Sequence, residues 1–342
     1  MLEPPFSIEI INYESLHKIK QTGWDLIVCD EAHTLGAFPK PNKRAKQIKE
    51  IIRRSNPFVI LLSGTPTPES YSQMYHQVYG IPNNPFKSFK NFYAFSKKYI
   101  NVKQKFINSI YINDYTNGLK SIIDEMSPYK LNYSQKMAGF KTTIDEKVLY
   151  VQLSSVCLNL IKKIKRDRVI QGDNEVVLAD TGVKLMSKVH QLCSGTVKFE
   201  SGNSMIVDNS KAKFIKKYFK NKKIGIFYKF KEEYKAIQSV FNDMITNDLD
   251  EFNSTNKSIA LQIVSGREGI SLKKAEALVY YNIDFSATSY WQSRDRMTTK
   301  DRVSNKIFWI FSKDGIERDI YKTVVKKKDY TLTHFKRDLL DL

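Results

Sequence analysis

The chain has 342 residues, of which 42% are hydrophobic and 12% aromatic, a composition that excludes a disordered protein and predicts about two packed domains. Its 55 basic and 36 acidic residues give a net charge of +19, which favours a polyanionic partner, although abundant Lys, Asn, Ile and Tyr are also typical of AT-rich genomes. We find no membrane-length apolar run and no signal-peptide pattern, and the three cysteines fit neither a metal cluster nor a disulfide framework. We therefore expect a cytoplasmic protein in a reducing compartment, with no membrane partner.

The N-terminal region is expected to contain a strand that ends in two carboxylates. Residues 8–11 predict a short strand and residues 12–19 a helix. Residues 26–29 form an apolar run that stops at Asp30 and Glu31. This pattern predicts a buried parallel strand whose C-terminal end lies where open α/β sheets bind ligands.

A second apolar run, residues 58–62, ends in Ser-Gly-Thr at 63–65. Residues 38–54 lie between the two runs and show the spacing of an amphipathic helix with a basic outer face. The three segments predict a βαβ unit with both strand ends at one edge of the sheet. In nucleotide hydrolases a carboxylate at such an edge holds Mg²⁺ and a neighbouring acid orients the attacking water. Asp30 and Glu31 are the candidates for these roles, and a solvated acidic turn is the alternative for an isolated Asp-Glu pair.

The rest of the chain predicts a helical region, a linker and a second α/β region. Residues 69–130 suggest helices with buried aromatic side chains, and the polar residues 135–143 suggest a linker. The remaining expected strands are 147–153, 224–228, 259–264, 277–281 and 306–311, and the expected helices include 157–168, 183–193 and 315–327.

Two segments near the C-terminus combine residues that suit phosphate binding. Residues 265–272 follow a predicted strand and carry Gly266 and Gly269, as expected where backbone amides must approach a phosphate. Gln292 and Arg296 are one helical turn apart and share a helix face.

Several of these segments resemble the motifs of a known family. Asp-Glu-Ala-His at 30–33, a DEAH sequence, and Ser-Gly-Thr-Pro at 63–66 look like motifs II and III of superfamily 2 helicases and translocases. The chain is most similar to the chromatin-remodeller-like branch, which also occurs in phages and large DNA viruses. In the same order, residues 224–230, 265–272 and 289–297 resemble motifs IV, V and VI.

The resemblance implies an α/β fold of two RecA-like lobes with mostly parallel sheets. Residues 1–130 would be a partial first lobe with motifs Ib, II and III and a helical extension, and residues 131–342 the second lobe with motifs IV, V and VI. The resemblance also implies residue roles: catalysis by Asp30 (also the Mg²⁺ ligand), Glu31 and Arg296; ATP contacts by His33, Gly269, Gln292 and Arg294; coupling of the sites by Ser63, Gly64 and Thr65; nucleic-acid contacts by Tyr13, Ser15, Lys229, Ser265, Gly266 and Arg267.

The sequence departs from the family pattern at the phosphate-binding loop. The chain has no Gly-x-x-x-x-Gly-Lys-Ser/Thr sequence, and only 24 residues precede Asp25, whereas a βαβ unit needs about 30 or more. We therefore expect the first lobe to be N-terminally incomplete, with the P-loop supplied by a missing N-terminal segment or by a separate polypeptide.

A second departure concerns motif VI. Thr299 stands where the family usually has its second arginine, Asp295 replaces a glycine, and in motif III Pro68 replaces an asparagine. Three alternatives follow: Arg296 or Arg294 reaches the phosphate in a shifted register, another basic residue (Lys300 or Arg302) substitutes, or the lobe no longer catalyses.

These observations predict a nucleic-acid-dependent ATPase of helicase or translocase type that uses ATP and Mg²⁺, with DNA favoured over RNA as its partner. A catalytically inactive nucleic-acid-binding module derived from such a motor is the alternative. A nuclease that uses Asp30 and Glu31 as metal ligands is a third, less favoured interpretation. The resemblance places the protein in the cytoplasm of a bacterium or of a virus-infected host cell.

Overall fold

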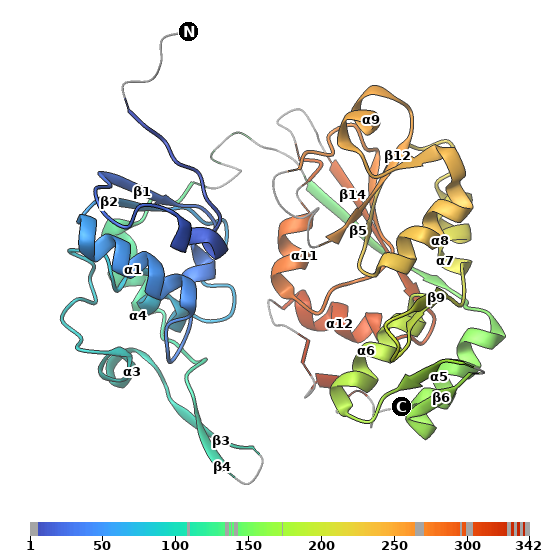
Figure 1. Ribbon diagram of the computed structural model, residues 1–342, viewed down its shortest axis with the longest axis horizontal. Helices are drawn as coiled ribbons and strands as arrows, with labels where there is room; N and C mark the ends of the chain where they lie inside the picture. Colours follow the sequence, from blue (N-terminus) through green and yellow to red (C-terminus); the bar gives the residue numbers. More distant parts are fainter. Residues whose placement is uncertain are drawn as a thin grey trace. The chain divides into compact units, whose positions relative to one another are not determined.

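A computed structural model of the chain describes residues 6–107, 110–133, 137, 139, 143–172, 174–263, 270–294, 296–298, 304–326, 330–331, 334–335 and 338. The chain divides into two compact units, Met1–Asn132 and Tyr133–Leu342, which are described separately (Figure 1). The sequence analysis placed this boundary between residues 130 and 131.

The N-terminal part of the first unit is a βαβ unit, as predicted. β1 (Leu26–Cys29) and β2 (Phe58–Leu61) pair in parallel. The connecting helix is α1 (Lys43–Ser55); it begins where the Asn42 side chain accepts a hydrogen bond from the N–H of Ala45. The helix ends at Asn56, whose left-handed backbone (φ 48°) stops it.

The two faces of this small sheet differ in exposure, because side chains alternate along a strand. One face packs on α1 and neighbouring turns in a cluster of buried residues: Leu16, Cys29, Ala32, Leu35, Ala45, Ile48, Ile51 and Ile52. The opposite face carries five large apolar side chains that are 46–82% exposed: Leu26, Val28, Phe58, Ile60 and Leu62. Parallel sheets are usually covered on both faces, so this exposed face is unusual.

Short helices and one hairpin form the rest of the first unit. The α-helices are α2 (Met74–Val78), α3 (Phe92–Tyr99) and α4 (Ser121–Met126); the 3₁₀ helices are η1 (Tyr13–Lys18), η2 (Ala32–Leu35), η3 (Tyr71–Gln73) and η4 (Ser127–Tyr129). The hairpin pairs β3 (Lys103–Ile107) with β4 (Ile110–Asp114). Aromatic rings fill the core here: the Phe95 ring centroid lies 4.8 Å from that of Tyr75 and 5.0 Å from that of Phe86.

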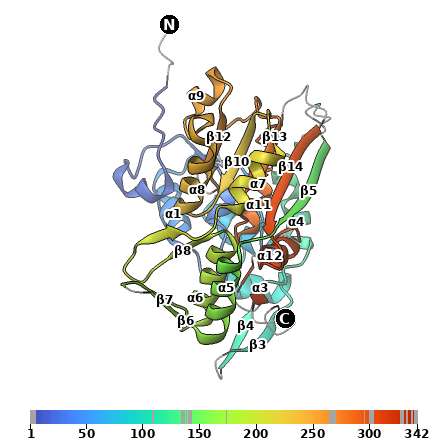
Figure 2. The same cartoon turned by 90° about the vertical axis from the view of Figure 1, so that its right-hand side faces the viewer.

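The second unit is built on a six-stranded sheet in which all neighbouring strands run parallel (Figure 2). In the order of the sheet, the strands are β11 (Ile245–Thr246), β12 (Ser258–Gln262), β10 (Ile224–Tyr228), β13 (Ala277–Tyr280), β14 (Ser304–Ser312) and β5 (Thr143–Val151). This sheet confirms the predicted α/β class with mostly parallel sheets. Consistent with strands buried on both faces, the central strands β10 and β13 are almost entirely apolar.

Helices cover both faces of this sheet. The helices are α5 (Ser155–Asp167), α6 (Gly182–Cys193), α7 (Ser210–Tyr218), α8 (Lys231–Phe241), α9 (Leu249–Ser254), α11 (Ala287–Ser293) and α12 (Glu317–Val324), with the 3₁₀ helix η5 (Asn242–Met244). α7 and α8 pack Ile215 and Ile237 on one face, whereas α11 and α12 pack Tyr290 and Ile320 on the other. Two short antiparallel pairs complete the unit: β6 (Val169–Gln171) with β7 (Val176–Leu178), and β8 (Thr196–Lys198) with β9 (Ser204–Ile206). None of the described helices combines the length and hydrophobicity that a bilayer crossing requires.

A buried ion pair fixes α7 against α12. The Lys211 Nζ lies 2.7 Å from Glu317 Oε1, and both side chains are fully buried. Lys211 also donates to the carbonyl of Tyr281, and Glu317 accepts from the N–H and hydroxyl of Ser312. Breaking such a pair leaves an uncompensated buried charge, so it holds the two helices in one arrangement.

Two sequence predictions are wrong. Residues 8–11 form no strand, because no described strand lies beside them to accept their backbone hydrogen bonds. Residues 69–130 are not purely helical, because β3 and β4 form a hairpin within them. The sequence analysis does not predict the two short antiparallel pairs, β6 with β7 and β8 with β9.

The difference between the two faces of the β1–β2 sheet predicts unequal effects of two substitutions. Ile51→Ala removes a buried side chain beneath the sheet and should lower the local stability of the first unit by about 2–5 kcal/mol. Phe58→Ser alters a side chain that is 82% exposed and should change it by less than about 0.5 kcal/mol. Native-state hydrogen exchange of the α1 amides measures both; equal losses would contradict the assigned faces.

Candidate active site

The parallel register of β1 and β2 places the residues that follow the two strands side by side. The N–H of Leu62 donates to the carbonyl of Cys29 at 2.9 Å, and the N–H of Ala32 donates to the carbonyl of Leu62 at 2.8 Å. The sheet edge therefore continues past both strands, and the segments 30–33 and 63–65 meet there. The structure thus brings together the two sequence segments that the prediction placed at one edge.

At this edge the side chains of Glu31, His33 and Ser63 and the backbone N–H of Thr65 form a continuous set of contacts. We name these four residues the strand-tip network. His33 Nδ1 lies 3.0 Å from Glu31 Oε2 and 3.2 Å from Ser63 Oγ. Ser63 Oγ accepts a hydrogen bond from the N–H of Thr65 at 3.2 Å. Through the His33 imidazole, the acid after β1 is physically connected to the hydroxyl after β2.

Glu31 adopts a backbone conformation that is unfavourable for a side chain of its kind. Its φ of 47° and ψ of 45° lie in the left-handed region, where a residue with a Cβ atom loses about 1–2 kcal/mol. This turn starts η2 and directs the chain back over β2, where Ala32 makes its hydrogen bond to Leu62. Strain of this kind often persists where a side chain must be held in one position for function.

Asp30 is exposed at the end of β1, and its neighbours hold its backbone. Its Oδ1 accepts the N–H of Glu31 at 2.9 Å, and its carbonyl accepts the Tyr13 hydroxyl at 2.6 Å. No group of three or more His, Cys, Asp or Glu side chains converges as a metal site in the described part of the chain. One exposed carboxylate suits Mg²⁺, which is usually bound by one or two carboxylates together with substrate phosphates and water. Asp30 fits that role.

Tyr13, in the 3₁₀ helix η1 that precedes β1, is hydrogen-bonded to the residue that follows β1. Burial, together with the neighbouring Cys29 and Asp30, raises the pKa of Tyr13 well above its ordinary value of 10.0. Its hydroxyl thus remains a hydrogen-bond donor to Asp30 at high pH. Ser15 lies in the same helix η1, and its N–H donates to the Asn12 side chain that caps the helix. Gly64, between Ser63 and Thr65, faces open space, because an added Cβ would meet no atom within 4 Å.

In the second unit, two of the predicted basic site residues are engaged in ion pairs. Arg294 Nη2 lies 2.6 Å from Glu146 Oε2, and the guanidinium stacks over the Tyr290 and Trp291 rings at 4.9 Å from each centroid. Lys229 Nζ lies 2.6 Å from Asp284 Oδ1. Although burial raises the pKa of the Asp284 carboxyl, the Lys229 charge and hydrogen bonds bring its net pKa below the ordinary range.

The remaining predicted residues of the second unit are only partly described. The carbonyl of Arg296 accepts the N–H of Leu272 at 2.7 Å, which joins the end of segment 289–297 to the end of segment 265–272. Gln292 lies in α11. Ser265, Gly266, Arg267 and Gly269 lie outside the described residues, as do Asp295, Thr299, Lys300 and Arg302.

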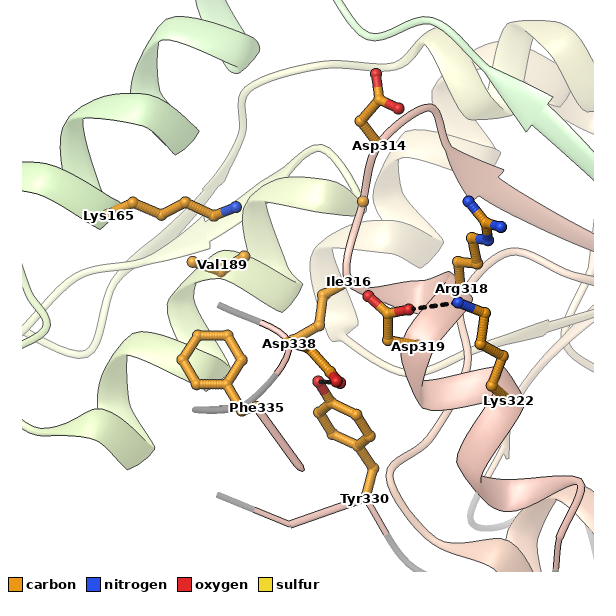
Figure 3. A pocket seen from close by; sticks show the side chains of 11 residues that line it. Lys165, Val189, Asp314, Ile316, Arg318, Asp319, Lys322, Tyr330, Phe335 and Asp338 are labelled. Atoms are coloured by element: carbon orange, nitrogen blue, oxygen red, sulfur yellow. Dashed lines mark hydrogen bonds and ion pairs between the residues drawn. The ribbon is translucent and has the colours of Figure 1, made fainter. Parts of the chain in front are cut away.

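A pocket of about 290 Å³ lies elsewhere in the second unit, between α5, α6, α12 and the C-terminal segment (Figure 3). Three basic and three acidic side chains surround it together with apolar ones. The lining residues are Lys165, Val189, Asp314, Gly315, Ile316, Arg318, Asp319, Lys322, Tyr330, Phe335 and Asp338. Asp319 and Lys322 pair with each other, as do Asp338 and the Tyr330 hydroxyl. None of the predicted site residues lines this pocket.

Sequence reasoning missed two features. Glu146, which holds Arg294, lies in β5, about 150 residues before its partner, and no sequence pattern signals such a pairing. The β3–β4 hairpin had a partial signal: Phe-Ile at 106–107 and Ile-Tyr-Ile at 110–112 are β-branched or aromatic, and only an Asn-Ser pair separates them.

The fold and the strand-tip network define an α/β protein with acidic and hydroxyl residues gathered at the C-terminal edge of a parallel sheet. A family model described as the SNF2-related domain matches residues 5–202. The chain belongs to the SNF2-related domain family, which confirms the predicted relation to remodeller-like superfamily 2 proteins. No curated protein sequence matches the chain.

Solved structures also match. The C-terminal part of the Fun30 ATPase domain is 13% identical with a TM-score of 0.43, over 58% of this chain and 96% of that chain. The Sulfolobus solfataricus SWI2/SNF2 ATPase core domain is 15% identical with a TM-score of 0.38, over 92% of this chain and 68% of that chain. The same core in complex with dsDNA is 16% identical with a TM-score of 0.34, over 88% and 66%, respectively.

The left-handed backbone at Glu31 predicts an unusual order of stability. Glu31→Gly and Glu31→Ala both remove the carboxylate, but only glycine relieves the strained φ, so Glu31→Gly should be more stable by about 1 kcal/mol. Asp30, which has no positive φ, is the matched control, and there glycine should be less stable than alanine. Hydrogen exchange of the α1 amides compares the four variants; the same order at both positions would contradict the prediction.

The Tyr13 hydroxyl predicts a pH-dependent contribution to stability. Tyr13→Phe removes its hydrogen bond to Asp30 and should cost about 1 kcal/mol at neutral pH. Because the folded-state pKa is raised, this contribution is fully present below the unfolded pKa of about 10 and is lost as the pH rises toward the folded-state pKa. Urea unfolding of both proteins between about pH 8 and 11 should show the difference shrinking above pH 10; a difference that grows with pH would contradict it.

Proposed function

We propose that the chain is part of a nucleic-acid-dependent ATPase of helicase or translocase type, in which ATP hydrolysis with Mg²⁺ drives movement on DNA. The observation that carries this proposal is the strand-tip network, because nothing in packing requires an acid, an imidazole and two hydroxyl residues in contact at one sheet edge. Membership in the SNF2-related family supports it.

Within the network each residue has a proposed role. Asp30 would hold Mg²⁺, which when bound neutralises charge on the nucleotide phosphates. Glu31 would orient the attacking water and take its proton, and His33 would hold the Glu31 carboxylate in place. Ser63 and Thr65 would pass a change at the carboxylates to the nucleic-acid site, because His33 contacts Glu31 and Ser63 at once.

In the second unit we propose Arg296 as the arginine that offsets charge on the γ-phosphate. Arg294 is less suited, because its guanidinium is held by Glu146 and by two aromatic rings, and its side chain is only 12% exposed. The motif V residues Ser265, Gly266 and Arg267, with Lys229, Tyr13 and Ser15, would contact the nucleic-acid backbone. Gly269, Gln292 and Arg294 remain proposed members of the nucleotide site.

A P-loop from a separate polypeptide or from an additional N-terminal segment is part of the proposal. The uncovered face formed by Leu26, Val28, Phe58, Ile60 and Leu62 supports it, because a parallel sheet of this kind is stable when both faces are covered. The segment that carries the P-loop would cover this face and complete the nucleotide site beside Asp30.

The net charge of +19 supports a nucleic-acid partner held mainly through phosphates, and we propose DNA as that partner. For comparison, the Sulfolobus solfataricus SWI2/SNF2 ATPase core was solved in complex with dsDNA. The cytoplasm of a bacterium or of a virus-infected cell is the proposed location, in line with a phage or viral origin. The three buried free cysteines fit a reducing compartment.

A catalytically inactive nucleic-acid-binding module is the second candidate. The observation that favours it is the ion pair of Arg294 with Glu146, which engages one of the two neighbouring arginines within the protein.

An ATPase assay on the purified chain, alone and co-expressed with the polypeptide encoded immediately upstream, separates these proposals. Alone, the chain should bind DNA with an affinity that falls as salt rises, and it should hydrolyse little ATP. With a P-loop polypeptide present, DNA-stimulated hydrolysis should appear, and Asp30→Ala or Glu31→Gln should lower it by about 100-fold or more. Asp25→Ala is the matched control, because Asp25 precedes the opposite end of β1, and it should leave hydrolysis unchanged.

Each other outcome has a definite meaning. DNA-stimulated hydrolysis by the chain alone, abolished by Asp30→Ala, would contradict the need for a second polypeptide. DNA binding without hydrolysis even when a P-loop polypeptide co-purifies would favour the inactive module.

A further inference from the structure

The β3–β4 hairpin lies outside the packed core of the first unit, so core packing does not account for its apolar side chains. Figure 1 shows it projecting from the helices of that unit. Its apolar side chains Phe106, Ile110 and Tyr111 are 63–70% exposed, whereas the aromatic side chains of α3 are largely buried. Exposed aromatic residues on a projecting element indicate a surface that meets a partner.

The base of the hairpin is firmly anchored, so the projection has a fixed direction. Beyond the paired strands, the N–H of Asn101 donates to the carbonyl of Asn117 at 3.0 Å, and the N–H of Leu119 donates to the carbonyl of Tyr99 at 2.9 Å. The Ser72 hydroxyl donates to the carbonyl of Tyr115 at 2.7 Å. At Gly118 an added Cβ would lie 2.7 Å from the backbone nitrogen of Ser72, so only glycine permits this close approach.

The register of the hairpin gives its two faces different chemistry. Phe106 lies opposite Tyr111, with their ring centroids 4.9 Å apart, and Gln104 lies opposite Asn113 on the same face. The other face carries Lys103 and Lys105 together with Ile110, Ile112 and Asp114. An aromatic pair flanked by amide side chains offers flat surfaces and hydrogen-bonding groups, which are the features that bind unstacked bases.

The charge around the hairpin favours a polyanion over a protein. Between residues 87 and 114 the chain has six lysines and a single acid, Asp114. All six lysines are exposed: Lys87, Lys90, Lys97, Lys98, Lys103 and Lys105. Asp114 pairs with Lys105 at 2.6 Å, which leaves a surplus of positive charge on residues 87–114 as a whole.

We infer that the β3–β4 hairpin binds single-stranded nucleic acid, with Phe106 and Tyr111 stacking on bases and Lys103, from the opposite face, contacting the backbone where the strand passes the edge of β3. The inference rests on the proposed function for its class of ligand. It adds a site outside every segment that the sequence analysis assigned to nucleic-acid contact, and it assigns that site to a single strand.

The test measures fluorescence anisotropy of the full chain with a labelled 20-nucleotide oligothymidylate and with a 20-base-pair duplex. The double variant Phe106→Ala, Tyr111→Ala should bind the single strand about tenfold more weakly or worse, because base stacking on the aromatic rings is lost. Its duplex affinity should change by less than about twofold, since duplex bases stay stacked on each other and backbone contacts dominate. Lys103→Ala should reduce the slope of log affinity against log salt on the single strand by about 0.7.

Three variants control for folding and for general loss of aromatic surface. Phe106→Leu, Tyr111→Leu keeps apolar bulk in the hairpin and should lose single-strand affinity like the alanine pair. Phe106→Tyr, Tyr111→Phe keeps both rings and should retain it. Tyr129→Ala removes another exposed tyrosine of the first unit, 59% exposed, and should have no effect. Thermal unfolding midpoints equal to that of the unaltered chain show that each variant is folded.

The outcomes separate this inference from the proposed function. Unchanged single-strand affinity in the alanine and the leucine double variants, or equal loss for single strand and duplex, would overturn the hairpin assignment while leaving the motor proposal in place. Unchanged affinity would then point to a protein partner for the hairpin. Failure of the unaltered chain to bind either nucleic acid would overturn both.

Discussion

The parallel pairing of β1 with β2 is the constraint on which the rest of the candidate site depends. It places the residues after both strands at one edge, and the hydrogen bond from Ala32 to Leu62 holds that edge beyond the strands. Only in this register can one imidazole, His33, contact Glu31 and Ser63 together. The left-handed backbone of Glu31 is the local cost of that arrangement, and it is compensated by the packing of η2 and α1 below the sheet.

In the second unit, charged side chains with little or no exposure form ion pairs with one another. Lys211 is fully buried against Glu317, and Gly315 has no room for a side chain because Ser312 and Glu317 lie against it. Arg294 is likewise held by Glu146 on the strand at the edge of the sheet. These interactions specify the packing of helices on the sheet, and a phosphate at Arg294 would have to compete with Glu146 for its guanidinium.

The first unit presents two exposed surfaces of opposite chemistry. The uncovered β1–β2 face is wholly apolar, which suits burial under further polypeptide, whereas the β3–β4 hairpin combines aromatic rings with lysines, which suits nucleic acid. The apolar face belongs to a sheet that packs on α1, and the hairpin is anchored at its base by the close contact of Gly118 with Ser72. The proposed motor would use both surfaces, and both belong to the first unit.

The sequence by itself determined the α/β class, the βαβ unit around Asp30 and Ser63, and most strands and helices of the second unit, because these depend on local periodicity and on the order of motifs. It could not show that residues 8–11 lack a strand partner or that residues 103–114 leave the helical core, since both depend on which segments pair. Only the tertiary structure decided that His33 contacts both strand ends and that Arg294 is held by Glu146. Such contacts join residues far apart in the chain, and their geometry is set by packing and register, which a linear pattern does not record.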